Sequence, residues 1–346
     1  MKDPRLRLSV VLITVQVLGQ TVLGFRLSIA QVLAAVLTSL VLEAGITLAR
    51  GGGLRWPASA MLTGNGVALL LRTVGTHHGD WWSLNGVQFF VAAAALGIAS
   101  KHLVRPFGRH IYNPSNLGLV LIFLLAGPAN VYPQYLWWGP LGPPVAAAWL
   151  VILAGAAWVL WPLRMWPMVL AFALPFALLV AGFAAAGRCF DAVWRVDSVC
   201  GANYWIGIAA SPEVAIFALF MMSDPRTAPR GRAARLAYGV LTAAVAGLLL
   251  YLQPTEFGVK VSILAALTIA CTLVPVIDGL LVARKRPGRT RPLALAVAVL
   301  VTLAVSVGVV GMSGNPQLAR YERGGAAPRG EGTLQQGTRA QPARLL

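Results

Sequence analysis

The sequence Asn113-Pro114-Ser115-Asn116 lies at the start of an apolar stretch. Asn113 is a favourable helix N-cap, and Pro114 suits the first helical position. The apolar stretch ends at Ala126, so the predicted helix is about 20 Å long, too short to cross a bilayer comfortably. Its N-terminus would offer free N–H groups to an anionic or carbonyl-bearing ligand. Asn113, Ser115 and Asn116 are therefore candidate ligand-binding residues, with a well-capped interfacial helix as the alternative interpretation.

A second polar cluster opens with Ser211-Pro212-Glu213 and closes, after an apolar run, with Asp224 and Arg226. Ser211 can cap a helix that starts at Pro212, and the carboxylate of Glu213 suits the first turn of that helix. Asp224 is unfavourable near lipid unless it is paired, as with Arg226, or faces a water-lined cavity. Ser211, Glu213 and Asp224 are therefore candidate ligand-binding residues. A structural turn with a local ion pair is the alternative.

The third cluster is Thr63-Gly64-Asn65-Gly66, again inside a short apolar stretch. Two glycines around a polar side chain allow the close approach of a ligand or of a neighbouring helix. Thr63, Gly64 and Asn65 are candidate ligand-binding residues under the first interpretation and helix-packing residues under the second. No catalytic residue is predicted, because the sequence contains no nucleophile motif, phosphate-binding loop or dinucleotide fingerprint.

Single residues elsewhere suggest further chemistry. Glu43 lies inside an apolar stretch, where a carboxylate is a candidate for proton or cation handling unless it reaches water at the nearby helix end. Cys189 and Cys200 share one loop and could form a disulfide in an oxidising compartment. His77 and His78 form a weak candidate metal pair. No metal site is predicted, since the sequence contains no C-x-x-C pattern.

The composition determines which elements position these clusters. Hydrophobic residues make up 58% of the 346 residues and charged residues only 11%, whereas soluble domains carry about 25% charged residues. Stretches long enough to span the hydrocarbon core as helices recur along the chain. The sequence therefore predicts an all-α polytopic membrane protein with ten or eleven transmembrane segments, at residues 8–24, 27–49, 58–72, 86–100, 113–126, 143–161, 166–187, 207–223, 234–252, 259–283 and 293–311.

The formal charge of +17 follows membrane topology rather than a nucleic-acid-binding face. With the N-terminus in the cytoplasm and every segment crossing, 18 of the 28 basic residues lie in cytoplasmic loops and five, among them Arg72 and Lys260, lie in opposite loops. Such an excess on one side is typical of cytoplasmic loops. We expect a lipid bilayer as the partner and no nucleic acid.

The uncharged aromatic loop 127–142 divides the chain into two groups of five segments. Because five is odd, a duplicated five-helix unit would insert upside-down the second time. Ala58-Ser59 and Ala210-Ser211 open the third segment of each half, which is a weak internal repeat with chance as the alternative. We therefore divide the chain into a first repeat (1–126), an outer aromatic loop (127–142), a second repeat (143–283), a basic loop with an extra helix (284–312) and a disordered tail (313–346).

Two motifs carry a resemblance to a known family: Asn113 to Gly118, and Phe220 to Pro229 with its Asp224-Pro225-Arg226-Thr227 turn. There the chain resembles RnfD and NqrB, membrane subunits of Rnf complexes and of sodium-pumping NADH:quinone oxidoreductase. It is most similar to the UnbU-type branch, named for enediyne biosynthetic clusters, in Trp137-Trp138-Gly139-Pro140 and Glu256-Phe257-Gly258. The resemblance covers roughly residues 20–283.

This resemblance implies two inverted five-helix repeats with short broken helices, a urea-transporter-like fold and a bacterial inner membrane. The redox subunits of the family attach flavin to the Thr of an Asp-x-x-Ser-Gly-Ala-Thr motif, which this sequence lacks. The resemblance therefore implies at most riboflavin or FMN bound non-covalently between the broken helices. We expect a subunit of an ion-translocating electron transport complex with redox partner subunits. The alternatives are a stand-alone channel or transporter for a small solute and an accessory membrane protein of a biosynthetic assembly.

Overall fold

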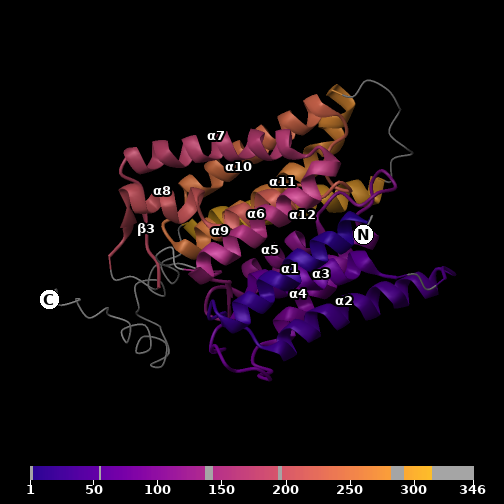
Figure 1. The fold of residues 1–346 in the computed structure, drawn as a ribbon. Helices are drawn as coiled ribbons and strands as arrows, with labels where there is room; N and C mark the ends of the chain where they lie inside the picture. Colours follow the sequence, from indigo (N-terminus) through magenta and orange to yellow (C-terminus); the bar gives the residue numbers. More distant parts are fainter. Residues whose placement is uncertain (1–2, 54–55, 137–142, 194–196, 282–291, 314–346) are drawn as a thin grey trace.

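Long helices that run side by side make up most of the computed structural model (Figure 1), which describes residues 3–53, 56–136, 143–193, 197–281 and 292–313. The first half contains α1 (Pro4–Thr21), α2 (Ile29–Ala49), α3 (Ala58–Leu70), α4 (Val87–Leu103) and α5 (Pro114–Ala126). The second half contains α6 (Pro143–Leu163), α7 (Trp166–Ala185), α8 (Gly201–Ala209), α9 (Pro212–Ile216), the π-helix η1 (Phe217–Met221), α10 (Arg232–Tyr251) and α11 (Glu256–Leu281). The extra helix α12 (Pro292–Ser313) follows, and the rest of the predicted tail lies outside the described residues.

Seven of the described helical segments are long and apolar enough to cross a membrane, and α3, α4 and α5 are shorter apolar helices. Large apolar side chains cover the outer faces of α2, α6, α7 and α12, where Val41, Leu150, Leu178 and Val307 are 67 to 73% exposed. Water would solvate these faces poorly, whereas lipid tails suit them. The chain is therefore a multi-pass membrane protein surrounded by lipid, as the sequence predicted.

The eighth predicted segment, 207–223, is the one that the structure changes most. Its helical backbone begins earlier, at Gly201, breaks at Ala210 and Ser211, and restarts with Ser211 as the N-cap of α9. The last part is the π-helix η1, and single π-turns are frequent at functional sites. The predicted N-cap at Ser211 is confirmed, whereas the predicted start of the segment, at residue 207, lies six residues after the observed start at Gly201.

Four short strands, in two antiparallel pairs, add extended backbone to the predicted all-α fold. Strand β1 (Leu71–Thr73) continues directly from α3. The helix is about 20 Å long and the strand about 10 Å, so α3 and β1 together match a hydrocarbon core of about 30 Å. Strand β2 (Val131–Pro133) follows α5 and pairs antiparallel with β1, with Arg72 opposite Tyr132. The chain after α5 therefore turns back into the core beside β1.

This re-entrant segment corrects the prediction of an aromatic loop at the outer membrane surface. Val131, Tyr132 and Leu136 are 0% exposed, and the backbone N–H of Gln134 donates to the carbonyl of Leu70. Extended backbone is tolerated at membrane depth only where protein surrounds it, and all six strand residues are buried. Trp137 and Trp138, also predicted to lie in that loop, are outside the described residues.

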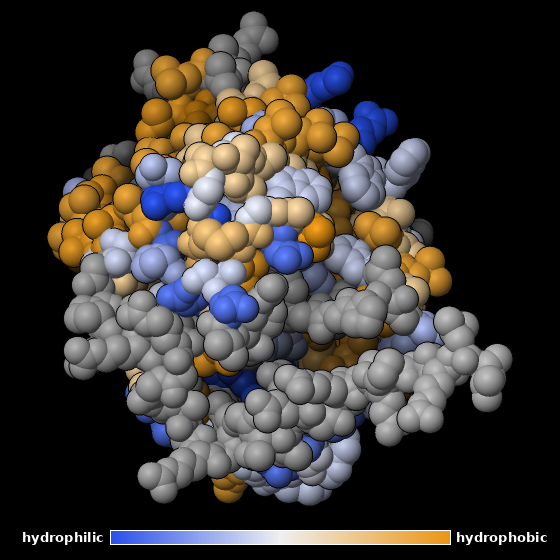
Figure 2. Space-filling view, turned by 90° about the vertical axis from the view of Figure 1, so that its left-hand side faces the viewer, coloured by the Kyte–Doolittle hydropathy of each residue, from blue (hydrophilic) through white to orange (hydrophobic). Residues whose placement is uncertain are grey.

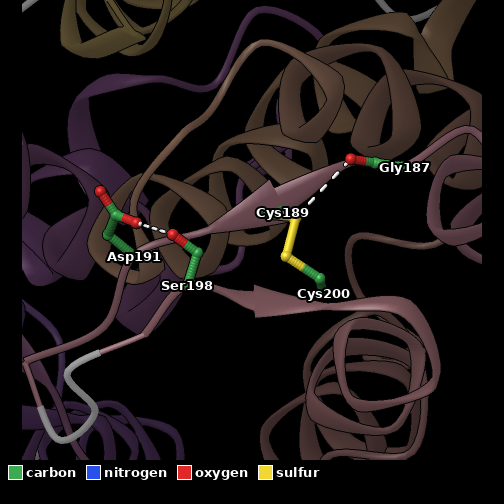
Figure 3. Close-up of a disulfide and its surroundings, with 5 residues drawn as sticks. All are labelled: Gly187, Cys189, Asp191, Ser198 and Cys200. Atoms are coloured by element: carbon green, nitrogen blue, oxygen red, sulfur yellow. Dashed lines mark hydrogen bonds between the residues drawn. A yellow bond between two sulfur atoms is a disulfide. The ribbon is translucent and has the colours of Figure 1, made fainter.

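A disulfide-bonded hairpin precedes α8. Strands β3 (Cys189–Phe190) and β4 (Val199–Cys200) pair antiparallel, and the predicted disulfide between Cys189 and Cys200 joins them (Figure 3). Asp191, which accepts a hydrogen bond from the Ser198 hydroxyl, also exchanges backbone bonds with Pro254 and Glu256 at the start of α11. The hairpin therefore holds the N-terminal end of α11. Figure 2 views this end of the molecule, where hydrophilic residues gather amid hydrophobic ones.

Loops predicted for one side of the membrane contact one another at one end of the bundle. Arg109 forms an ion pair with Asp278 at 2.9 Å, and the Arg50 guanidinium lies 3.2 Å from the ring of His102. Loops predicted for the other side meet at the opposite end, where the Ser28 hydroxyl donates to the carbonyl of Ser83. Between these ends, α1 packs on α6 and α5 packs on α11. The first and fifth helices of one half thus pack against the first and fifth helices of the other.

Candidate functional site

A large cavity of about 240 Å³ opens at the end of the bundle where α1 begins. The first half of α1, the length of α3, the start of α5, the end of α6, and η1 with its following turn form its walls. Its apolar surface comes mainly from leucines of these helices. The polar and charged groups in its wall are Asp3, Arg5, Ser59, Thr63, His110, Asn113, Ser115, Ser223, Asp224 and Arg226.

Asn113 joins the two interrupted elements at this cavity. Its side-chain Oδ1 accepts from the backbone N–H of Asn116 at 3.2 Å and from the Ser115 hydroxyl at 2.9 Å, which confirms the predicted N-cap. Its Nδ2 donates to the carbonyl of Met221, the last residue of η1, at 3.1 Å. One side chain therefore caps a backbone N–H at the start of α5 and binds the last carbonyl of η1.

Burial and neighbouring charge perturb two titratable groups in the large cavity. Burial raises the pKa of Asp224, against the opposing effect of the backbone N–H of Arg226, which donates to its Oδ1 at 3.0 Å. The predicted pairing of these two residues is thus made through the backbone. Burial, with Lys101, Arg226 and other nearby cations, lowers the pKa of His110 to about 4. His110 is therefore a neutral imidazole at pH 7.

A small cavity of about 40 Å³ lies toward the other end, where β3 and α8 stand. The turn after β2, Phe190 of β3, the starts of α9 and α11, and nearby parts of α8 and α11 line it. The Lys260 ammonium lies 3.1 Å from Glu213 and 2.9 Å from Glu256. It thereby ties the broken helix α9 to α11. Leu70, the last residue of α3, borders both cavities.

Aromatic and cationic side chains support this ion-bridged group. The ring of Tyr135 lies 4.5 Å from the Lys260 ammonium and 4.5 Å from the Arg72 guanidinium, which also approaches the ring of Tyr132 at 5.3 Å. Cation–π contacts of this kind strengthen when they are desolvated. Arg72 is only 2% exposed and Lys260 only 9%. Their predicted position in outer loops is therefore wrong, since both lie inside the protein.

The structure distributes the predicted site residues over both cavities. Thr63, Asn113, Ser115 and Asp224 line the large cavity, and Ser211 and Glu213 line the small one. Gly64, Asn65 and Asn116 line neither of these two. They make contacts between helices instead.

A Cβ atom on Gly64 would lie 2.5 Å from the Cα of Val36 and 2.6 Å from the carbonyl oxygen of Ala35, so this glycine allows α3 to pack closely on α2. The Nδ2 of Asn116 donates to the carbonyl of Leu264 and to the Thr268 hydroxyl, at 2.9 and 3.0 Å. The backbone carbonyl of Asn65 accepts from Gln16 at 3.4 Å. These contacts fit the helix-packing alternative for Gly64.

The sequence analysis missed Arg72, Gln134, Glu256 and Lys260 as site residues. The spacing of Glu256 and Lys260, i and i+4 on one helix, was the available signal. Glu43, a partly buried carboxylate, pairs with Lys101 at 2.5 Å and His102 at 2.8 Å near the end of α4. Among the described residues, no group of histidines, cysteines and carboxylates is arranged to hold a metal ion.

Comparison of the chain with models of known protein families and with curated proteins finds no match.

Proposed function

We propose that the chain is a membrane carrier that moves a small polar solute between the large cavity and the small cavity. The observation that carries this proposal is the position of Leu70, which borders two separate cavities. A carrier that exposes its site to one side at a time requires such a thin barrier between two opposed openings. The basic loops around the large cavity favour a cytoplasmic position for it.

An inverted repeat supports this proposal, because it would relate the two cavities to each other. The large cavity is lined by the start of α3, at Ser59, and by the start of α5, at Asn113. The small cavity is lined by the start of α9, at Ser211, and by the start of α11, at Glu256. These are the third and fifth segments of the two halves. A two-fold axis in the membrane plane would therefore exchange the cavities.

Non-covalent flavin, which the resemblance implies, is a separate proposal for the large cavity. Its leucine-rich walls suit a flat ring system. The amide of Asn113 is already engaged by Ser115, Asn116 and Met221, so the polar edge of a flavin would have to pair with other polar groups of the wall. We favour the carrier because it also accounts for the second cavity beyond Leu70. A yellow chromophore in the purified protein would instead favour flavin and a redox subunit.

Thiol labelling from each side of the membrane tests the carrier. Leu62→Cys lies in the wall of the large cavity and Ile263→Cys in the wall of the small one. In sealed vesicles, a membrane-impermeant maleimide should label the first from the N-terminal side only and the second from the opposite side only. A transported solute should change the two labelling rates in opposite directions. Labelling of both positions from one side would overturn the proposal.

A further inference from the structure

Gln134 presents an amide without a partner to the small cavity. The side chain is 1% exposed and lines the cavity. Neither its Oε1 nor its Nε2 has a hydrogen-bond partner among the residues that the structure describes. A buried amide in this state is unfavourable, and most buried polar groups in proteins are paired. The side chain is therefore suited to a partner that enters and leaves the cavity.

Arg72 is the second buried group with open hydrogen-bonding positions. It stands opposite Tyr132 in the β1–β2 pair, so Arg72, Leu70 and Gln134 share one face of that pair. Its Nε and Nη1 have no hydrogen-bond partner within the described part of the chain, although the rings of Tyr132 and Tyr135 lie beside it. A buried guanidinium offers a fork of N–H donors that matches a planar oxyanion.

The charges around the small cavity determine what an anion would require. The charged residues in its wall are Lys260, Glu213 and Glu256, and Arg72, which also contacts the ring of Tyr135, brings these four charges to balance. The titratable neighbours are Tyr135, Tyr204 on α8 and Asp191, whose carboxylate accepts an exposed hydrogen bond from Ser198; α6 carries no charged residue. A monovalent anion would leave one excess negative charge in a medium of low dielectric constant. Transfer of one proton from solution to a carboxylate would restore the balance and release Lys260 to face the anion.

From these observations we propose that the small cavity binds a small monovalent oxyanion, such as a short carboxylate, together with one proton that restores the charge balance of the Lys260 cluster. The proposal rests on the carrier function and specifies its solute and coupling. The oxyanion would accept hydrogen bonds from Gln134 Nε2 and Lys260, which line the cavity, and Arg72 on the same face of the strand pair would add a positive charge beside it. A cavity of about 40 Å³ holds about three water-sized groups, which limits the solute to a few non-hydrogen atoms.

Binding to the full-length protein in detergent tests this proposal. Formate and nitrate are the anionic probes, and urea and choline are the neutral and cationic controls, each titrated calorimetrically at pH 5.5, 6.5 and 7.5. The anions should bind more tightly as the pH falls, and the controls should not bind. Glu213→Gln carries the shape of a protonated carboxyl group, so it should bind anions with no dependence on pH.

Gln134→Leu separates binding from folding. It removes the unpartnered amide atoms, so the ligand-free protein should melt at the same temperature as the wild type or higher. The variant should bind formate about tenfold more weakly or worse, because a hydrogen bond to a charged group is lost. Arg188→Gln removes a partly buried cation that contacts Tyr251 outside the cavity, and it should bind formate as the wild type does.

Three results would overturn the proposal: binding of urea or choline in place of the anions, anion binding unaffected by Gln134→Leu, or a lower melting temperature of ligand-free Gln134→Leu. The labelling experiment on Leu62→Cys and Ile263→Cys reports separately on the carrier. Alternating labelling driven by a neutral solute would leave the carrier in place and reject the oxyanion. Anion binding without alternating labelling would keep the site and reject the carrier.

Discussion

Leu70→Ala should turn the proposed carrier into a leak. Leu70 is 7% exposed, and its side chain separates a space of about 240 Å³ from one of about 40 Å³. The substitution removes three carbon atoms, and at about 0.8 kcal/mol per buried methylene the transfer term is about 2 kcal/mol. Because open space already borders Leu70 on both sides, the additional cavity term is small and the loss stays at the lower end of the usual range for Leu→Ala.

The same change should lower the barrier to passive permeation. If the leucine seal contributes about 2 kcal/mol to that barrier, its removal raises the leak about thirtyfold, since each 1.4 kcal/mol changes a rate tenfold. The assay is stopped-flow light scattering of proteoliposomes challenged with glycerol, with empty liposomes as the baseline. Concentrative uptake should be lost at the same time, because both cavities would open to each other.

Leu119→Ala is the matched control. Leu119 is 0% exposed in α5 and lines neither cavity, so the same deletion should cost at least as much stability without joining them. Melting temperatures of both variants in detergent would show whether their losses of stability match. A glycerol leak in Leu70→Ala no larger than in Leu119→Ala would refute the view that this residue separates two halves of a pathway.

Three further perturbations should have measurable effects. Cys189→Ser combined with Cys200→Ser opens a loop closed across 11 residues, so the free energy of unfolding should fall by about 3 kcal/mol; denaturation with and without reductant checks this, and equal stability would contradict it. Asn113→Ala removes the cap of α5 and its bond to Met221, so we expect about 1 to 2 kcal/mol lower stability and impaired transport, whereas Asn113→Asp should restore the cap but not the bond to Met221. The pKa of His110 is lowered to about 4, so the unfolded chain takes up its proton first, and stability should fall as the pH drops from about 6.5 to about 4; a melting temperature of His110→Gln with the same pH slope would contradict this.

Hydropathy predicted most of the helices because lipid selects for long apolar stretches whatever the neighbouring helices are. The start at Trp166 and the end at Ala49, for example, agree with the predicted segments to the residue. Capping chemistry is equally local, which is why Asn113 and Ser211 were predicted correctly as N-caps. Such features need only a few consecutive residues.

Features that depend on tertiary pairing could not be predicted in the same way. Arg72 and Lys260 are charged residues at the ends of apolar stretches, and such residues usually mark loops. Only the pairing of β1 with β2, and the approach of Tyr135 and Glu213, make their burial favourable. Tyr132 was expected in the outer aromatic loop. An aromatic residue suits a membrane interface and a protein core equally, so its type alone could not place it.

The pairing of β1 with β2 also constrains how the chain enters the membrane during its synthesis. Strand β1 emerges before α4, α5 and β2 have been made, and until β2 arrives its backbone N–H and C=O groups have no strand partner. Lipid cannot supply one. We therefore expect α3 and Arg72 to remain beside the insertion machinery, shielded from lipid, until the following hairpin folds back against them.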